Sequence, residues 1–390
     1  MPSAHPPTLE RPARSPELPQ QRTPTLTPAL APNVRPMPGP NDKPAARPES
    51  LWGARLKNLA EVAVRPRPPV GTTPADVVHR ENKWSLLRYR RDTLPCFATP
   101  VLLVPSLINR HYVLDLLPGK SLAEWLVARG HDVFVIDWGT PGDEDRFVTF
   151  DDVCDRAIGR ALRKTASFGA RGKAHLLGYC LGGLLTVLHT AARPEHVASL
   201  LTLAAPVKFG ADEGLLSAWT RTPTFDLDAL VDATGNVPWP LMQAAFNMLR
   251  PTLGLSKAVQ LVDRAWNDEF LDGFFALETW GNDNVSFPGE CFREYIRAHY
   301  RGDELAQGTF HLSGIPTRLE DVRVPLLAVT FEHDTIVPKA SALPLVERAG
   351  SPDKTHLHLP GGHVGAVVSS AAKRRLWPKL SEFWARNDSS

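Results

Sequence analysis

The sequence is poor in the features that mark several classes of protein. Only four of its 390 residues are cysteine. These four have neither the CxxC spacing of a metal site nor the density of a disulfide framework, so we expect no bound metal and a reducing, cytosolic setting. The formal net charge is only +2, and no run of Lys or Arg is long enough to indicate nucleic-acid binding.

Long apolar segments are also missing. No apolar run approaches the roughly 18 residues that a membrane helix needs, so no transmembrane segment is predicted. The opening residues, MPSAHPPTLERPARSP, lack an apolar stretch, and we therefore expect no secretory signal. Proline, in contrast, is concentrated: 14 of the 37 prolines lie within the first 50 residues. Residues 1–48 are predicted to form a disordered Pro-rich arm, because their apolar surface is too small to offset chain entropy.

From residue 49 onward the pattern is typical of an α/β protein. The segment 73–90 alternates like a pair of edge strands, and apolar strands then alternate with amphipathic helices. Strands that are apolar throughout predict a mostly parallel sheet with helices on both faces. The alternation lapses over residues 207–320, which are rich in Trp, Phe, Pro and Asp. We interpret this stretch as a cap inserted between two parts of the core, 49–206 and 321–390.

A short motif inside this core predicts a nucleophile. The sequence GYCLGG, residues 178–183, matches the nucleophile elbow G-x-S-x-G with Cys180 in the position of the serine. The elbow is a strained turn from strand to helix, where side chains two positions before and after the nucleophile would collide with neighbouring backbone, which explains Gly178 and Gly182. Gly183 follows as a further glycine of the elbow. The start of the following helix favours a thiolate. An isolated cysteine is usually a small buried hydrophobe, but this pattern favours catalysis.

An acid and a base are expected after the nucleophile in chain order. Asp334 follows the apolar strand VPLLAVTF, and His363 follows two glycines after the last strand. Both positions lie at the carboxyl ends of strands, where the active sites of open α/β sheets gather. His363 is predicted to accept the proton of Cys180, or to hold it as an ion pair, while Asp334 orients the imidazole. The competing side chains are Glu332 and His333 beside the acid, and His356 and His358, which alternate within the strand.

The predicted oxyanion hole combines two backbone N–H groups. One belongs to Leu181, and the other to Leu107 or Ile108 in the loop after the first core strand. Sulfur at the elbow also bears on the reaction. A cysteine that takes an acyl group from a thioester exchanges one thioester for another, so the acyl group stays activated and is passed downhill to an alcohol. The cysteine therefore favours acyl transfer over plain hydrolysis.

Taken together, the motifs resemble those of a known family, the polyhydroxyalkanoate synthases, and most of all the short class III catalytic subunit. The resemblance extends from about Thr72 to the C-terminus. It is carried by LINRHYVLDLLPGKSLAEWLVARGHDVFVIDWG, GYCLGG, FPGECFREY, EHDTIVP and GGHVG, which occur in this order. It implies an α/β-hydrolase fold in which Cys180 carries the growing chain as a thioester. His363 would activate Cys180, and Asp334 would assist His363 in activating the incoming 3-hydroxyl group.

The resemblance also implies the substrate and the partners. The substrate would be an (R)-3-hydroxyacyl-CoA, with the CoA thioester in place of any separate cofactor, and the products a growing polyester chain and free CoA. A homodimer at the surface of cytoplasmic polymer granules, with a second, non-catalytic synthase subunit, is implied as well. The residues that flank the nucleophile, Tyr179 and Leu181, mix features of different classes, so the subclass stays open. The alternatives are a Cys-dependent hydrolase, either a thioesterase or an intracellular polyester depolymerase, and an inactive granule-associated homologue.

Overall fold

The computed structural model describes residues 48–210, 215–249 and 253–388. The predicted Pro-rich arm lies outside these residues except for Pro48, with which helix α1 (Pro48–Glu61) begins. Among the described residues, an eight-stranded sheet has the strand order β1-β2-β4-β3-β5-β6-β9-β10. The strands are β1 (Ala75–Glu81), β2 (Trp84–Tyr89), β3 (Val101–Val104), β4 (Val133–Asp137), β5 (Ala174–Tyr179), β6 (Val197–Leu203), β9 (Leu326–Phe331) and β10 (Lys354–Leu359).

The sheet is mostly parallel, as the sequence predicts. β2 pairs antiparallel with both β1 and β4, and all other neighbouring strands run parallel. The inner strands β3, β5, β6 and β9 are buried at every residue, because helices cover both faces. β1, at one edge, is only partly buried.

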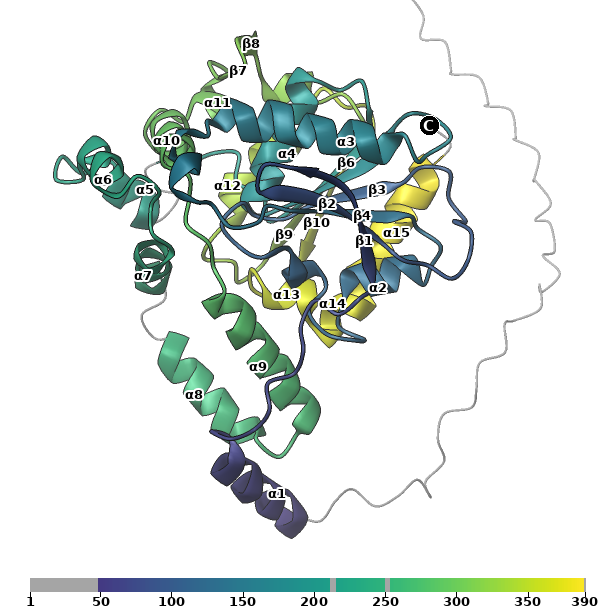
Figure 1. The fold of residues 1–390 in the computed structure, drawn as a ribbon, viewed down its shortest axis with the longest axis vertical. Helices are drawn as coiled ribbons and strands as arrows, with labels where there is room; N and C mark the ends of the chain where they lie inside the picture. The colour runs from purple at the N-terminus through teal and green to yellow at the C-terminus, as the bar shows by residue number, and fades with distance from the viewer. Residues whose placement is uncertain (1–47, 211–214, 250–252, 389–390) are drawn as a thin grey trace, which may run out of the picture. The chain divides into compact units, whose positions relative to one another are not determined.

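Two apolar clusters lie on opposite faces of the sheet. Neighbouring residues of one strand alternate between them: Leu102 of β3 belongs to one cluster and Leu103 to the other. The first cluster includes helices α3 (Ile158–Ala166) and α4 (Leu181–Ala192), and the second includes α2 (Leu122–Val127) and α15 (Trp377–Asn387) (Figure 1). The remaining helices of the core are η1 (His111–Leu114), η2 (Asp143–Phe147), the π-helix η3 (Asp152–Ala157), α12 (Lys339–Arg348), α13 (Gly365–Val368) and α14 (Ser370–Arg375).

The chain between β6 and β9 is mainly helical where it is described. Its elements are α5 (Leu215–Thr220), α6 (Leu227–Thr234), α7 (Trp239–Leu249), α8 (Leu253–Arg264), α9 (Asp268–Asn282), α10 (Gly289–Glu294), the π-helix η4 (Tyr295–Arg301), α11 (Glu304–Gln307), the hairpin of β7 (His311–Leu312) and β8 (Ile315–Pro316), and η5 (Leu319–Asp321). These elements lie within the predicted cap, residues 207–320, except that η5 extends one residue further to Asp321. The boundaries of that cap as a subdomain stay a prediction. No helix in the described ranges is long and apolar enough to span a membrane.

Candidate active site

Cys180 occupies a strained turn between β5 and α4. Its backbone has φ of 57° and ψ of −127°, a conformation that side-chain-bearing residues rarely adopt. A Cβ atom at Gly178 would come to 2.5 Å from the Cα atom of Gly183, and one at Gly182 would come to 2.5 Å from the carbonyl oxygen of Pro105. Both contacts are far inside van der Waals distance, so the tight turn tolerates only glycine at these positions. The turn places Cys180 at the N-terminus of α4.

Asp334 and His363 meet at the same edge of the sheet. Asp334 lies just after β9, and its Oδ2 atom is 2.7 Å from Nδ1 of His363, which lies in the loop after β10. The other oxygen of Asp334, Oδ1, accepts hydrogen bonds from the backbone N–H groups of Ile336 at 3.0 Å and Val337 at 2.8 Å. The carboxylate is completely buried and the imidazole is 8% exposed. All acceptor directions of the carboxylate are therefore defined by the fold.

The imidazole of His363 is held in its charged form. Burial lowers the pKa of His363, but the charge of Cys180 and the hydrogen bonds to Asp334 and Cys180 outweigh burial and raise the pKa to about 10. Because Nδ1 is bonded to Asp334, the nitrogen that faces Cys180 is Nε2. The surroundings favour an imidazolium beside the carboxylate of Asp334 and the sulfur of Cys180.

Three of the four competing side chains have other surroundings, whereas His333 lines the same cavity as Cys180. Glu332 is exposed and has no place in the contact between Asp334 and His363. His356 and His358 lie on β10, and each forms a 2.8 Å hydrogen bond with Oγ1 of Thr330 on the neighbouring strand. Among the described residues, no group of three His, Cys, Asp or Glu side chains is placed to hold a metal ion.

Tyr179 is a contact of His363 that motif reasoning did not find. Its ring stacks on the imidazole with the centroids 5.3 Å apart, and its hydroxyl donates a 3.2 Å hydrogen bond to the carbonyl oxygen of His363. Tyr179 is almost completely buried. The sequence shows only an aromatic residue before the nucleophile, because the loop that it touches is 184 residues further along the chain.

A cavity of about 750 Å³ opens onto the sulfur. Cys180, Leu181 and His363 lie in its wall, and helices between β6 and β9 contribute mainly apolar and aromatic side chains to the rest. The two residues considered for the second oxyanion donor, Leu107 and Ile108, are both buried in the core cluster, and Ile108 also lines this cavity. The choice between their N–H groups stays a prediction. The cavity is large enough for an acyl chain, and its lining excludes much water from the sulfur.

Comparisons with known proteins agree with this arrangement. Residues 65–126 match the family model described as the poly-beta-hydroxybutyrate polymerase (PhaC) N-terminus, and residues 101–374 match that of the alpha/beta hydrolase family. A relative from Allochromatium vinosum, named poly(3-hydroxyalkanoate) polymerase subunit PhaC, is 34% identical over 80% of this chain and 88% of its own length. The chain belongs to the PhaC family.

Some PhaC relatives are considerably longer than the part that this chain matches. The subunit from Haloferax mediterranei is 33% identical over 85% of this chain but 66% of its own length. The subunit from Cupriavidus necator is 30% identical over 78% of this chain. The match covers 53% of that relative's own length, so this chain spans about half of it. The family resemblance and the α/β-hydrolase fold predicted from the sequence are both confirmed.

Proposed function

We propose that this chain is a polyhydroxyalkanoate synthase, an acyltransferase that polymerises (R)-3-hydroxyacyl-CoA with release of CoA. The observation that carries the proposal is the buried contact of Asp334 with His363, beside Cys180, at a mainly apolar cavity in a PhaC family member. The three side chains have the chemistry of an acid, a base and a nucleophile. We assign them these roles in the same proposal.

In the first step, the thiolate of Cys180 attacks the thioester carbonyl of the substrate. The carbon–sulfur bond to CoA breaks as the bond to Cys180 forms, and the imidazolium of His363 gives its proton to the leaving CoA thiolate. The N–H groups of Leu181 and Ile108 would stabilise the oxyanion of the intermediate. The raised pKa of His363 supports this step, because it keeps the proton donor charged.

In the second step, the neutral imidazole of His363 accepts the proton of the 3-hydroxyl group of an incoming hydroxyacyl-CoA. The hydroxyl oxygen attacks the thioester on Cys180, and the sulfur leaves as the thiolate. The chain, now one unit longer and bound to CoA, is returned to Cys180 by a repeat of the first step. Asp334 stabilises the imidazolium that forms, and its two backbone hydrogen bonds keep it in position.

The assignment of partners belongs to the same proposal. The homodimer, the non-catalytic subunit, the granule surface and the cytoplasmic location are those that the family resemblance implies. The apolar lining of the cavity supports a polyester chain as the bound product, since an aliphatic chain gains by leaving water. The same lining protects a thioester on Cys180 from hydrolysis.

Mass spectrometry of the full chain incubated with (R)-3-hydroxybutyryl-CoA tests the proposal. We expect a series of adducts on Cys180 that differ by one hydroxybutyryl unit, together with release of CoA and growing turbidity. Cys180→Ala should abolish the adducts and the CoA release, whereas Cys96→Ala, which removes an exposed free cysteine, should change neither. Soluble free acid without oligomers, even after addition of a non-catalytic subunit from a relative, would instead identify a hydrolase.

A further inference from the structure

The segment Tyr295–Arg301 between α10 and α11 is a π-helix. Such turns are rare and frequently mark functional sites. In an α-helix, residues five positions apart point about 140° away from each other, because each turn holds about 3.6 residues. The wider π-turn brings Tyr295 and Tyr300 together, with their rings edge to face and the centroids 5.3 Å apart.

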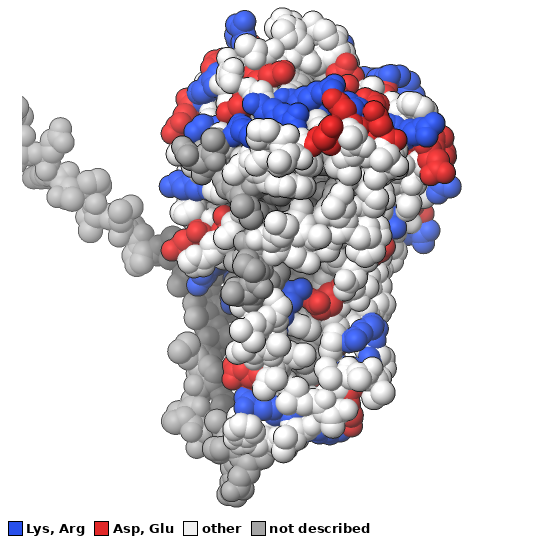
Figure 2. Space-filling view, turned by 90° about the vertical axis from the view of Figure 1, so that its left-hand side faces the viewer, with Lys and Arg blue, Asp and Glu red and all other residues white. Residues whose placement is uncertain are grey.

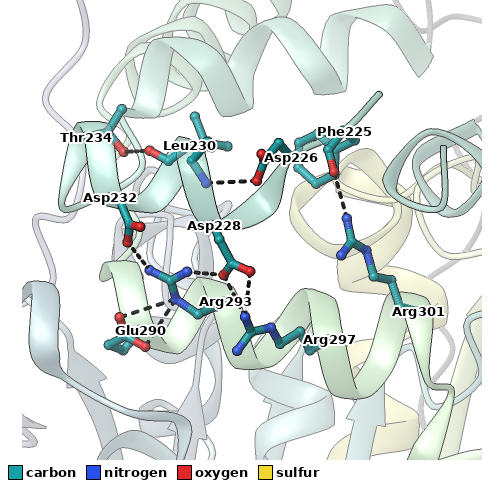
Figure 3. A network of polar contacts seen from close by, with 11 residues as sticks. Phe225, Asp226, Asp228, Leu230, Asp232, Thr234, Glu290, Arg293, Arg297 and Arg301 are labelled. Carbon is teal, nitrogen blue, oxygen red and sulfur yellow. Dashed lines mark hydrogen bonds and ion pairs between the residues drawn. The ribbon is translucent and has the colours of Figure 1, made fainter. Parts of the chain in front are cut away.

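Three arginines fix the outer side of this segment. Arg293 contacts three carboxylates, those of Asp228, Asp232 and Glu290, and its side chain is only 11% exposed (Figure 3). Arg297 shares the carboxylate of Asp228 at 2.6 Å, and Arg301 donates to the carbonyl oxygen of Phe225 at 2.8 Å. Figure 2 shows basic and acidic side chains gathered in the upper part of the face that carries α6 and α10. These contacts tie η4 and the adjoining α10 to α6 and to the residue Phe225 before it, so the orientation of the π-turn is defined.

The inner side of the segment faces the cavity. Tyr295 and Tyr300 both line it, together with Cys180. Burial and, to a lesser extent, the charge of Cys180 raise the pKa of Tyr300 to about 12, so its hydroxyl keeps its proton at neutral pH. Burial raises the pKa of Tyr295 well above that of a free tyrosine, and a hydrogen bond links its side chain to that of Tyr300. A tyrosine hydroxyl can accept one hydrogen bond and donate another, so the Tyr300 hydroxyl has the capacity to donate to a ligand in the cavity.

We propose that the Tyr300 hydroxyl donates a hydrogen bond to the oxygen at position 3 of the acyl group that is loaded on Cys180. This inference rests on the proposed function and deepens it. The proposed donors to the thioester carbonyl are backbone N–H groups at the elbow. Tyr300 belongs to a different element, η4, and its hydroxyl is suited to an atom further along the acyl chain of the substrate. A buried donor without its partner is costly, so this contact selects 3-hydroxyacyl groups over acyl groups that lack the oxygen.

The test compares two substrates in single-turnover acylation of Cys180. The rates of CoA release from (R)-3-hydroxybutyryl-CoA and from butyryl-CoA are measured for the natural chain and for Tyr300→Phe. We expect Tyr300→Phe to slow acylation by the hydroxylated substrate on the order of tenfold, the effect of one lost hydrogen bond in a dry site. The rate with butyryl-CoA should rise, because butyryl-CoA leaves the Tyr300 donor without a partner in the natural chain. Tyr89→Phe, which removes a buried hydroxyl of β2 outside the cavity, should change neither rate.

Two results would overturn the inference. One is an unchanged preference for the hydroxylated substrate in Tyr300→Phe. The other is an equal loss of acylation rate with both substrates, which would mean that the Tyr300 hydroxyl acts on the Cys180 thiol or stabilises the fold. Tyr295→Phe keeps the Tyr300 hydroxyl, so it should retain more of the preference than Tyr300→Phe, and the reverse order would also contradict us. If the natural chain is acylated at Cys180 by neither substrate, the proposed function itself fails.

Discussion

Replacing Asp334 by asparagine tests the proposed catalytic machinery most directly. The oxygen of the new amide is expected to keep the hydrogen bonds from Ile336 and Val337, so the NH₂ group must face His363. Two donors would then oppose each other at the contact that is now 2.7 Å long. His363 avoids this conflict only by losing the proton on Nδ1, which leaves a neutral imidazole with its proton on Nε2. The nitrogen that faces Cys180 then cannot accept the proton of the thiol.

The size of the effect follows from the electrostatics of His363. Its pKa lies at about 10 instead of 6.5, a difference that corresponds to ~5 kcal/mol. Both Cys180 and Asp334 contribute to this stabilisation of the imidazolium. The asparagine variant loses the contribution of Asp334 and also the correct tautomer of His363. We expect the acylation rate to fall by about 10³- to 10⁴-fold, as wrong-tautomer substitutions do in other triads.

The assay is single-turnover release of CoA from (R)-3-hydroxybutyryl-CoA. Glu332→Gln is the matched control, because it removes an exposed carboxylate two residues away and should leave the rate unchanged. Thermal unfolding of both variants shows whether the fold is retained. If Asp334→Asn keeps more than about a tenth of the natural rate, or Glu332→Gln loses as much as Asp334→Asn, our assignment of the acid is wrong.

Three further outcomes are expected. Cys180→Ala removes the largest contribution that raises the pKa of His363, so NMR titration should show a lower pKa. The raised pKa of His363 stabilises the folded state below pH 6.5, and this stability is lost as the pH rises through about 10. Cys180→Ala should therefore make the free energy of unfolding depend less on pH between about 6.5 and 10. Gly182→Ala should lower the free energy of unfolding in urea by about 1–3 kcal/mol because its Cβ would collide with backbone, whereas Gly53→Ala, with open space around it in α1, should raise it slightly. Arg293→Met should lower the free energy of unfolding by about 1–2 kcal/mol, and less in about 1 M salt, since its carboxylate partners are partly exposed.

Much of the candidate site was visible in the sequence, because its signals are local. The glycines around Cys180 indicate a turn that leaves no room for side chains at their positions. Apolar strands directly precede Asp334 and the loop of His363. In a parallel sheet the carboxyl ends of such strands meet at one edge. The order of the motifs and the burial pattern of the strands were therefore enough to predict the fold class and to nominate these three residues.

The tertiary structure alone decided which distant side chains surround them. The stacking of Tyr179 on His363 joins segments that are 184 residues apart, and no local pattern encodes it. The meeting of Tyr295 with Tyr300 depends on a π-turn, whereas helical periodicity predicts that they diverge. Likewise, only the structure shows that Ile108 lies both in the buried core cluster and in the wall of the cavity. Sequence patterns predict burial and turn geometry within single segments. Contacts between distant segments arise only when the whole chain packs together, so no local pattern predicts them.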